Sequence, residues 1–326
     1  MAALSQVAII GLGLMGSSLG LALHRLPRPP RVVGFDIDPD HTRQALRLRA
    51  VDAYTGALDE VVRDADLVVI AVPVRSVEAI FRDIAAHLRH GCVVTDTGST
   101  KQAVCAWASE LLPSHAAFVG GHPMTGRLTG GVAEASADLF QGVLYCLTPG
   151  PSTSPQAIDL VVQLVQSVGA HPYFLDPREH DSLVAGISHL PYLIASTLVD
   201  TLAAERGWQE MSTLAAGGFA TTARLAEGDP QMYADICLTN REAILHHLDR
   251  YLEALREVRA AIARGDEGLR ERFHRAQQRH REWRIRREDG QPSASRAVEM
   301  PSSNLLVPRG LDRLLGRRDD RPMERR

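Results

Sequence analysis

Short apolar runs alternate with helical patterns along the first half of the chain. Runs of strand length lie at residues 7–10, 31–36, 67–72, 92–96, 117–120, 143–147 and 172–174. Apolar residues recur at three- and four-residue spacing over residues 14–26, 76–88 and 156–168, which is typical of helices with one buried face. The run at 67–72 is apolar throughout, as expected for a strand that is covered on both sides. The alternation predicts an α/β fold, a parallel sheet with helices on both faces.

The second half of the chain carries helical patterns without strand signals. After about residue 176 we expect helices at 181–206, 211–226 and 231–263 and a charged helix at 266–287, with an interruption at Pro191 and a start signal at Asp229-Pro230. From residue 288 the chain is rich in Pro, Ser and Arg without periodicity, which is typical of a disordered tail. Three parts are therefore expected: an α/β domain over 1–175, an all-helical domain over 176–287, and a tail over 288–326.

Composition agrees with this plan and excludes several classes of protein. A chain of 326 residues suggests two domains, and 45% hydrophobic with 23% charged residues argues against a wholly disordered chain. The net charge of −3 provides no basic footprint for nucleic acid. No uninterrupted apolar run approaches the roughly 18–20 residues of a membrane span. The first six residues lack the basic region and cleavage signal of a secretory peptide.

Cysteine and histidine spacing bears on compartment and on metals. The four cysteines are far apart and form no CxxC, so buried free thiols in a reducing compartment are favoured over a disulfide. These features indicate a soluble, cytoplasmic protein that binds no membrane. The 13 histidines show no HExxH pattern, and no metal site is expected. Of the 36 Lys and Arg residues only Lys101 is a lysine, a bias that usually reflects coding composition.

A glycine motif follows the first predicted strand and opens a helix. It comprises Gly11, Leu12, Gly13, Leu14, Met15 and Gly16. In this context GxGxxG indicates a Rossmann-type dinucleotide site, because the turn lets a pyrophosphate reach the backbone at the helix N-terminus. Asp36 ends the second strand, where a carboxylate can accept hydrogen bonds from the adenosine ribose and repel a 2′-phosphate. Because Ile37 supplies no compensating arginine, NAD is favoured over NADP. A structural glycine turn without ligand is the alternative.

Polar residues follow two later strands at the edge of the sheet where ligands of such folds bind. Ser99 and Lys101 lie in DTGSTK after the strand at 92–96, and a helix N-cap by Ser99 or Thr100 is the alternative reading. His122 follows the next strand between glycine and proline. An imidazole there is well placed as a general base because it titrates near neutrality, although a single loop histidine is more often a bystander.

The helical half offers further candidates for substrate contact. Ser188 and Tyr192 are spaced i, i+4 and share a helix face, whereas His189 points elsewhere and is expected to be structural. Arg224 follows a stretch of small residues, and arginine binds carboxylates in bidentate fashion. A surface arginine is the alternative. The pair at 180–181, His-Asp, is expected to be a helix start only.

These motifs, taken in order, resemble the prephenate and arogenate dehydrogenases of tyrosine biosynthesis over roughly residues 6 to 265. The resemblance is carried by GLGLMGSSLG, VVGFD, DTGSTK, GGHPMTG, HDxxxxxxSHLPY and GGFxxxxRLAxxDPxMY. It implies that the glycine motif and Asp36 bind NAD. It implies that His122 is the base that accepts the proton of the substrate's ring hydroxyl, that Ser99 hydrogen-bonds that hydroxyl and orients the histidine, and that Arg224 binds a substrate carboxylate.

The resemblance also implies which residues line the substrate pocket. At two places the chain departs from the family pattern. Ser188 and Tyr192 match positions that line the pocket from the helical domain. Many members have a second histidine where this chain has Tyr192. Many members have Thr/Ser-Glu where this chain has Arg127 and Leu128. An acidic side chain there would receive the amino group of arogenate, so Leu128 favours prephenate.

The implied reaction is the NAD-dependent oxidative decarboxylation of prephenate. The products are 4-hydroxyphenylpyruvate, CO2 and NADH, with no metal and no covalent intermediate. Arogenate or an amino-substituted prephenate is the alternative substrate. A β-hydroxyacid-type dehydrogenase is a second alternative, although those enzymes use a lysine in the helical domain that this chain lacks. A non-catalytic NAD-binding protein is a third.

The helical half is expected to form a homodimer. The segment 181–206 carries apolar residues on most faces, too many for one buried stripe. Leu193, Ile194, Leu198 and Leu202 would then be removed from water only in the dimer. The resemblance implies the same, because the helical domain of the family makes the dimer interface.

Overall fold

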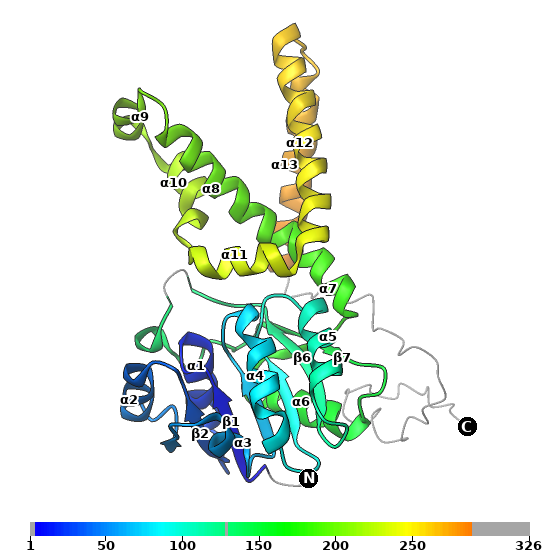
Figure 1. Cartoon of the computed structure of the whole chain (residues 1–326). Coiled ribbons are helices and arrows are strands. Elements are labelled where there is room, and N and C mark those ends of the chain that lie inside the picture. The colour runs from blue at the N-terminus through cyan, green and yellow to red at the C-terminus, as the bar shows by residue number, and fades with distance from the viewer. Residues whose placement is uncertain (1–3, 128–129, 289–326) are drawn as a thin grey trace, which may run out of the picture. The chain divides into compact units, whose positions relative to one another are not determined.

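The structure is a computed structural model, and it describes residues 4–127 and 130–288 (Figure 1). Leu128 and nearly all of the tail expected over 288–326 lie outside the described residues. The chain divides into two compact units, residues 1–266 and 267–326. The first unit holds the sheet and the helices around it. In the second unit the described part is a single charged helix, α13 (Leu269–Glu288).

An eight-stranded sheet forms the first half of the chain, in the order β3-β2-β1-β4-β5-β6-β7-β8. The strands are β1 (Gln6–Ile10), β2 (Arg31–Phe35), β3 (Ala53–Tyr54), β4 (Leu67–Ile70), β5 (Val93–Asp96), β6 (Ala117–Pro123), β7 (Leu144–Pro149) and β8 (His171–Phe174). All neighbours pair in parallel except β6 and β7, which are antiparallel. The expected Rossmann-type sheet is confirmed. The short β3 and the antiparallel pairing of β7 were not predicted, because apolar periodicity does not encode strand direction.

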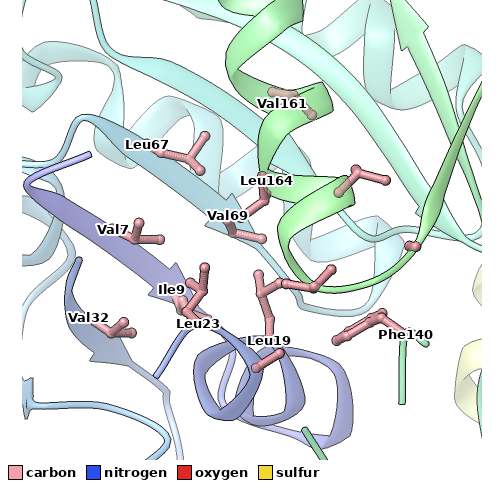
Figure 2. Packing of buried hydrophobic residues seen from close by; sticks show 14 of the residues in the cluster. Val7, Ile9, Leu19, Leu23, Val32, Leu67, Val69, Phe140, Val161 and Leu164 are labelled. Carbon is pink, nitrogen blue, oxygen red and sulfur yellow. The ribbon is translucent and has the colours of Figure 1, made fainter. Parts of the chain in front are cut away.

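Helices cover both faces of the sheet because the strand residues alternate between two cores. In β1, Val7 and Ile9 pack in one cluster and Ala8 and Ile10 in the other. Figure 2 shows the first cluster, with Leu19 and Leu23 facing the strands from the helix that follows β1. The covering helices are α1 (Leu14–Leu23), α2 (Pro39–Arg47), α3 (Leu58–Val62), α4 (Val77–Ile84), α5 (Gln102–Leu111) and α6 (Pro155–Ser167), with short 3-10 turns η1 (Val74–Ser76), η2 (Ala85–His87) and η3 (Val132–Glu134).

The order of the strands reverses beside β1. From β1 the chain moves outward to β2 and β3 on one side, and then returns to place β4 on the other side of β1. Loops that leave the carboxyl ends of β1 and β4 diverge to opposite faces at such a point. Open α/β sheets bind ligands in the resulting crevice, which puts the glycine turn after β1 at the expected binding edge.

The second half of the first unit is helical. Its elements are α7 (Pro177–Val184), the π-helical turn η4 (Ala185–His189), α8 (Leu190–Ala203), α9 (Trp208–Leu214), α10 (Gly217–Ala223), η5 (Arg224–Glu227), α11 (Pro230–Thr239) and α12 (Arg241–Arg264). In Figure 1, α8 and α12 diverge as they leave the sheet domain. The helix expected from residue 181 begins four residues earlier, because the Asp176 side chain caps it and Pro177 occupies its first turn. Asp229 and Pro230 start α11 in the same way, as the sequence predicts.

The helical half buries little apolar surface against the other described residues. Its core consists of Ala185, Ile236 and Ile244 with a few half-buried neighbours. In α8 only Ala195 is buried, so most apolar residues of that helix remain accessible to water. Along α12 the exposed apolar residues follow heptad-like spacing, at Leu245, Leu252, Leu255 and Ile262.

One helical stretch, Pro177–Ala203, is long and apolar enough by length and composition to cross a membrane. The search for uninterrupted apolar runs in the sequence did not find this stretch, because polar residues interrupt it. Length and composition alone are weak support for a span, since core helices of soluble proteins meet the same criterion. His180 and Asp181, within this stretch, are buried against polar groups of the sheet domain.

Candidate active site

The glycine turn after β1 has the shape of a phosphate cradle. A Cβ on Gly11, whose φ is +93°, would lie 2.4 Å from the Ala71 carbonyl oxygen, and a Cβ on Gly16 would lie 1.9 Å from the Gly11 carbonyl oxygen. Both positions therefore require glycine. Around Gly13 no atom lies within 4 Å of an added Cβ, so the backbone is open there to a ligand. The space at Gly13 and the free N–H groups at the start of α1 fit a pyrophosphate.

Asp36 connects the end of β2 to this turn. Its Oδ2 accepts a hydrogen bond from the Leu12 N–H at 2.6 Å, and its Oδ1 accepts one from the Asp38 N–H at 2.8 Å. His41 Nδ1 lies 3.3 Å from Oδ1. Ile37 is almost fully exposed beside it. A carboxylate held at this place fits the ribose hydroxyls of a dinucleotide.

A buried ion pair joins β5, β6 and the loop before α5. The Lys101 ammonium and the Asp96 carboxylate are in direct contact, and both side chains are fully buried. Lys101 Nζ also donates to the Gly121 carbonyl at 2.7 Å, and Asp96 accepts from the Gly98 and Gly121 N–H groups at 2.8 and 3.0 Å. The lone lysine of the chain thus fixes the backbone immediately before His122.

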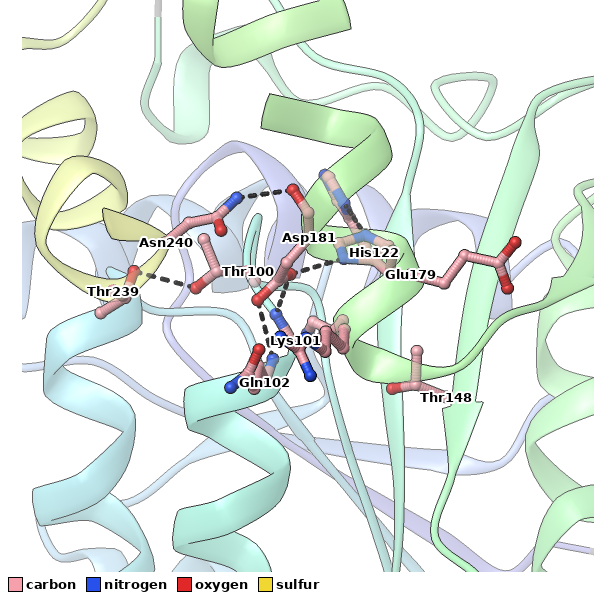
Figure 3. A network of polar contacts seen from close by, with 12 residues as sticks. Thr100, Lys101, Gln102, His122, Thr148, Glu179, Asp181, Thr239 and Asn240 are labelled. Atoms are coloured by element: carbon pink, nitrogen blue, oxygen red, sulfur yellow. Dashed lines mark hydrogen bonds and ion pairs between the residues drawn. The ribbon is translucent and has the colours of Figure 1, made fainter. Parts of the chain in front are cut away.

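His122 lies within β6, opposite Cys146 of β7, and not in a loop as the sequence suggests. It is held by a chain of imidazole and carboxylate groups that begins in α7 (Figure 3). Its Nδ1 lies 2.9 Å from His180 Nε2, and His180 Nδ1 lies 2.8 Å from Asp181 Oδ1. The Asp181 carboxylate also accepts the N–H groups of Lys101 and Gln102 at 2.7 and 2.9 Å. Asp181 therefore caps α5 from another element, where the sequence suggested Ser99 or Thr100 as the cap.

Two further contacts join the helical half to the sheet domain near the hydrogen-bonded groups His122, His180 and Asp181. The hydroxyls of Thr100 and Thr239 are 3.0 Å apart. Asn240, at the break between α11 and α12, donates to the Asp181 carbonyl at 2.7 Å and lies 3.3 Å from His189 Nδ1. His189 is buried in these contacts, which agrees with its expected structural role.

Burial lowers the pKa of His122 well below its ordinary value of 6.5, and neighbouring groups add to the effect. Loss of hydration is the largest cause, and His180, Lys101 and His189 contribute in the same direction. His122 is consequently neutral at pH 7. A neutral imidazole at a strand's carboxyl end is able to accept a proton.

The other predicted residues lie in the loop after β5 and in the helical half. Ser99 is half-buried in the loop between β5 and α5, and β5 is the strand next to that of His122. Ser188 lies in the π-helical turn η4. Pro191 causes this irregularity, because it has no N–H to offer the carbonyl four residues earlier. Such turns are frequent at functional sites.

Tyr192 and Arg224 occupy the helical half. Tyr192 stacks on Tyr233 with ring centroids 3.4 Å apart, and both rings pack against Gly228. Arg224 is exposed on η5, and within residues 4–127 and 130–288 it forms no ion pair with a carboxylate. Its guanidinium is available to an anionic ligand. Within the described residues no group of three or more His, Cys, Asp or Glu is arranged to hold a metal ion.

Sequence reasoning missed His180 and Asp181, which it took for a helix start. The available signal was Asp176-Pro177, which already provides the N-cap and first turn of α7. Because the helix already has a start signal at Asp176-Pro177, His180 and Asp181 are not needed to begin it and must have another role. The partners of the pair, on β6 and α5, are distant in sequence and no local pattern points to them.

Two stretches of the chain match known families. Residues 19–174 match the family described as prephenate dehydrogenase, nucleotide-binding domain, and residues 176–278 match that described as prephenate dehydrogenase, dimerization domain. The glycine turn precedes the first matched stretch, so its assignment rests on its geometry.

Individual proteins agree with the family matches. The prephenate dehydrogenase of Bacillus subtilis (strain 168) is 36% identical over 262 residues, which cover 80% of this chain and 71% of that protein. The prephenate dehydrogenase of Lactococcus lactis subsp. cremoris (strain MG1363) is 31% identical over 275 residues, covering 83% and 75%. The crystal structure of prephenate dehydrogenase from A. aeolicus in complex with hydroxyphenyl propionate and NAD+ superposes with a TM-score of 0.81 at 29% identity, covering 86% and 98%.

Proposed function

The chain belongs to the prephenate dehydrogenase family, and we propose that it catalyses the NAD-dependent oxidative decarboxylation of prephenate to 4-hydroxyphenylpyruvate. This reaction is a step of tyrosine biosynthesis. The cofactor is NAD, as in the A. aeolicus structure, and the glycine turn with Asp36 would hold it. When bound, NAD supplies the acceptor for the hydride that leaves the carbinol carbon of the substrate.

His122 is the general base in this proposal. The observation that carries the proposal is its placement, neutral and aligned by His180 and Asp181, at the carboxyl end of β6. His122 takes the proton of the ring hydroxyl as the hydride departs. The ring carboxylate then leaves as CO2, the electrons of the broken C–C bond make the ring aromatic, and the phenolate oxygen regains the proton from His122. The protein supplies orientation and one base, with no covalent intermediate.

The remaining predicted residues bind the substrate in this proposal. Ser99 hydrogen-bonds the ring hydroxyl beside His122, and Arg224 holds a substrate carboxylate. Ser188 and Tyr192 line the pocket from the helical half. Leu128, which replaces an acidic residue found in many members, provides no acceptor for the ammonium of arogenate, so prephenate is preferred.

The domain boundaries and assembly follow from the same family. We place the NAD-binding domain at 1–175 and the helical substrate and dimerisation domain at 176–287, with the tail from 288. The protein works in the cytoplasm as a homodimer in this proposal. Support comes from the dimerization domain matched at 176–278 and from the small core of the helical half.

A side-by-side assay of NADH release with prephenate and arogenate tests the substrate. We expect the larger kcat/KM for prephenate. A discrimination of about 2 kcal/mol corresponds to roughly 30-fold. Leu128→Glu should raise the relative activity on arogenate. A wild-type ratio at or below one would refute the preference for prephenate, while NADH release from neither substrate would refute the dehydrogenase itself.

A further inference from the structure

We propose that His180 is a positioning residue that, held by Asp181, keeps His122 in the tautomer with a proton on Nδ1 and a free lone pair on Nε2. The inference rests on the proposed function, because it assigns the atom of His122 that receives the substrate proton. It concerns two residues of α7 that are fully or almost fully buried and lie outside the substrate contacts described above.

The Asp181 carboxylate can only accept hydrogen bonds. Its two oxygens accept the first N–H groups of α5, from Lys101 at 2.7 Å and Gln102 at 2.9 Å. A helix N-terminus favours a negative charge, so it holds the side chain as a carboxylate. The nitrogen 2.8 Å from Oδ1 of Asp181 is Nδ1 of His180. That nitrogen must therefore be the donor.

The direction of the next bond follows. In this proposal His180 carries a single N–H, which it donates to Asp181. Its Nε2 then carries a lone pair and accepts. The partner atom 2.9 Å away is His122 Nδ1, which must donate. The remaining nitrogen of His122, Nε2, is left without a proton and is the atom that can act as base.

The same series of hydrogen bonds stabilises the cation that His122 becomes after proton transfer. When Nε2 takes the hydroxyl proton, His122 becomes a cation whose Nδ1–H bond to His180 is strengthened by charge. The polarised His180 in turn strengthens its bond to the Asp181 carboxylate. No proton needs to leave His122 during this step. Without His180, the buried Nδ1–H would have no partner, and the opposite tautomer, inactive as a base, would become accessible.

Two isosteric variants separate the two bonds of His180. In His180→Asn the amide occupies the place of Nδ1, so it keeps the bond to Asp181 and loses the bond to His122. In His180→Gln the amide occupies the place of Nε2, so its oxygen still accepts from His122. His171→Asn, at an exposed position on β8, is the control. If His180→Asn does not fold, the wild-type tautomer and the glutamine variant still decide the question.

The decisive readout is the ¹⁵N NMR spectrum of histidine-labelled protein with NAD bound, in which the His122 signals are identified by their absence in His122→Asn. We expect a protonated Nδ1 and a bare Nε2 in wild type, and a mixture of tautomers in His180→Asn. We also expect His180→Asn to lower kcat at least about 10-fold more than His180→Gln, within the roughly 10²–10⁴-fold that a positioned base contributes, without changing NAD affinity.

A proton on Nε2 in wild type, an unchanged tautomer in His180→Asn, or equal kcat values for the two variants would each overturn the proposal. The spectrum is independent of turnover. If wild-type protein failed to oxidise prephenate while His122 showed the expected tautomer, the proposed function would fail and the positioning role would stand.

Discussion

At the scale of single residues, the chemistry depends on an imidazole that is neutral before the substrate arrives. Burial, His180 and Lys101 hold the pKa of His122 below 6.5, and catalysis needs the unprotonated ring. The value of kcat/KM should therefore be constant near pH 7 and fall only as the pH drops through this lowered pKa. A pH profile of kcat/KM for prephenate measures it. A half-maximal rate at or above pH 6.5 would contradict the account.

Removing the base itself should separate binding from chemistry. His122→Asn should lower kcat by about 10²–10⁴-fold, the usual contribution of a positioned base, and abolish the acid limb of the pH profile. Because the glycine turn and Asp36 follow β1 and β2, away from His122 on β6, NAD affinity should not change. Fluorescence titration of NAD and steady-state kinetics provide the two quantities. Near-normal turnover would remove His122 from the mechanism.

The buried ion pair under His122 should matter to stability. Lys101→Met would leave the Asp96 carboxylate fully buried with only backbone N–H partners. Breaking a buried pair in this way costs about 3–5 kcal/mol. The midpoint of urea unfolding, at one protein concentration, should fall markedly. Arg82→Met removes an exposed pair with Glu78 and is the control, with little expected change. Equal midpoints for the two variants would show that the pair is not structural.

At the scale of elements, the sequence predicts what local patterns encode. The glycine turn, the apolar strands β1 and β4, and the Asp-Pro start of α11 were all readable, since each depends on neighbours in sequence. The antiparallel direction of β7 could not be predicted, because the pairing of a strand depends on tertiary packing. The contact between α7 and β6 could not be predicted for the same reason, although His122, His180 and Asp181 are all present in the sequence.

The cofactor preference is a property of the β1–α1 turn together with the end of β2. Asp36 faces that turn through its bond to the Leu12 N–H, and Ile37 beside it is exposed and uncharged. The double substitution Asp36→Ser with Ile37→Arg should remove a repulsion toward the 2′-phosphate and add an attraction. The ratio of kcat/KM for NAD to that for NADP should shift toward NADP. If wild type already used NADP as well as NAD, the role given to Asp36 would be incorrect.

At the scale of the whole molecule, the described residues of the helical half bury few apolar side chains, which supports the proposed homodimer. Its largest apolar cluster has three buried members, while α12 exposes a stripe that includes Leu252 and Leu255. We expect the wild type to sediment as a dimer at micromolar concentration. Leu252→Asp with Leu255→Asp should shift it toward monomer, because charges would replace apolar contacts in the interface. Leu48→Asp, exposed on the sheet domain, should leave the dimer intact.

A wild-type protein that sediments as a stable monomer would contradict the homodimer. A dimer unaffected by the double substitution would place the interface elsewhere than on the α12 stripe. The sequence indicates the excess of apolar residues on α8. It does not indicate which of these residues are buried by other parts of the same chain. Leu193, Ile194, Leu198 and Leu202 are all only half-buried in the single chain.

The central claim is that this protein couples oxidation of prephenate by NAD to loss of the ring carboxylate. The most direct test measures NADH and CO2 in the same reaction with prephenate, with wild type and His122→Asn in parallel. We expect wild type to release the two products in equal amounts, together with 4-hydroxyphenylpyruvate, and His122→Asn to release almost none while still binding NAD. NADH formation without CO2, or no NADH from prephenate by a protein that binds NAD, would contradict the account.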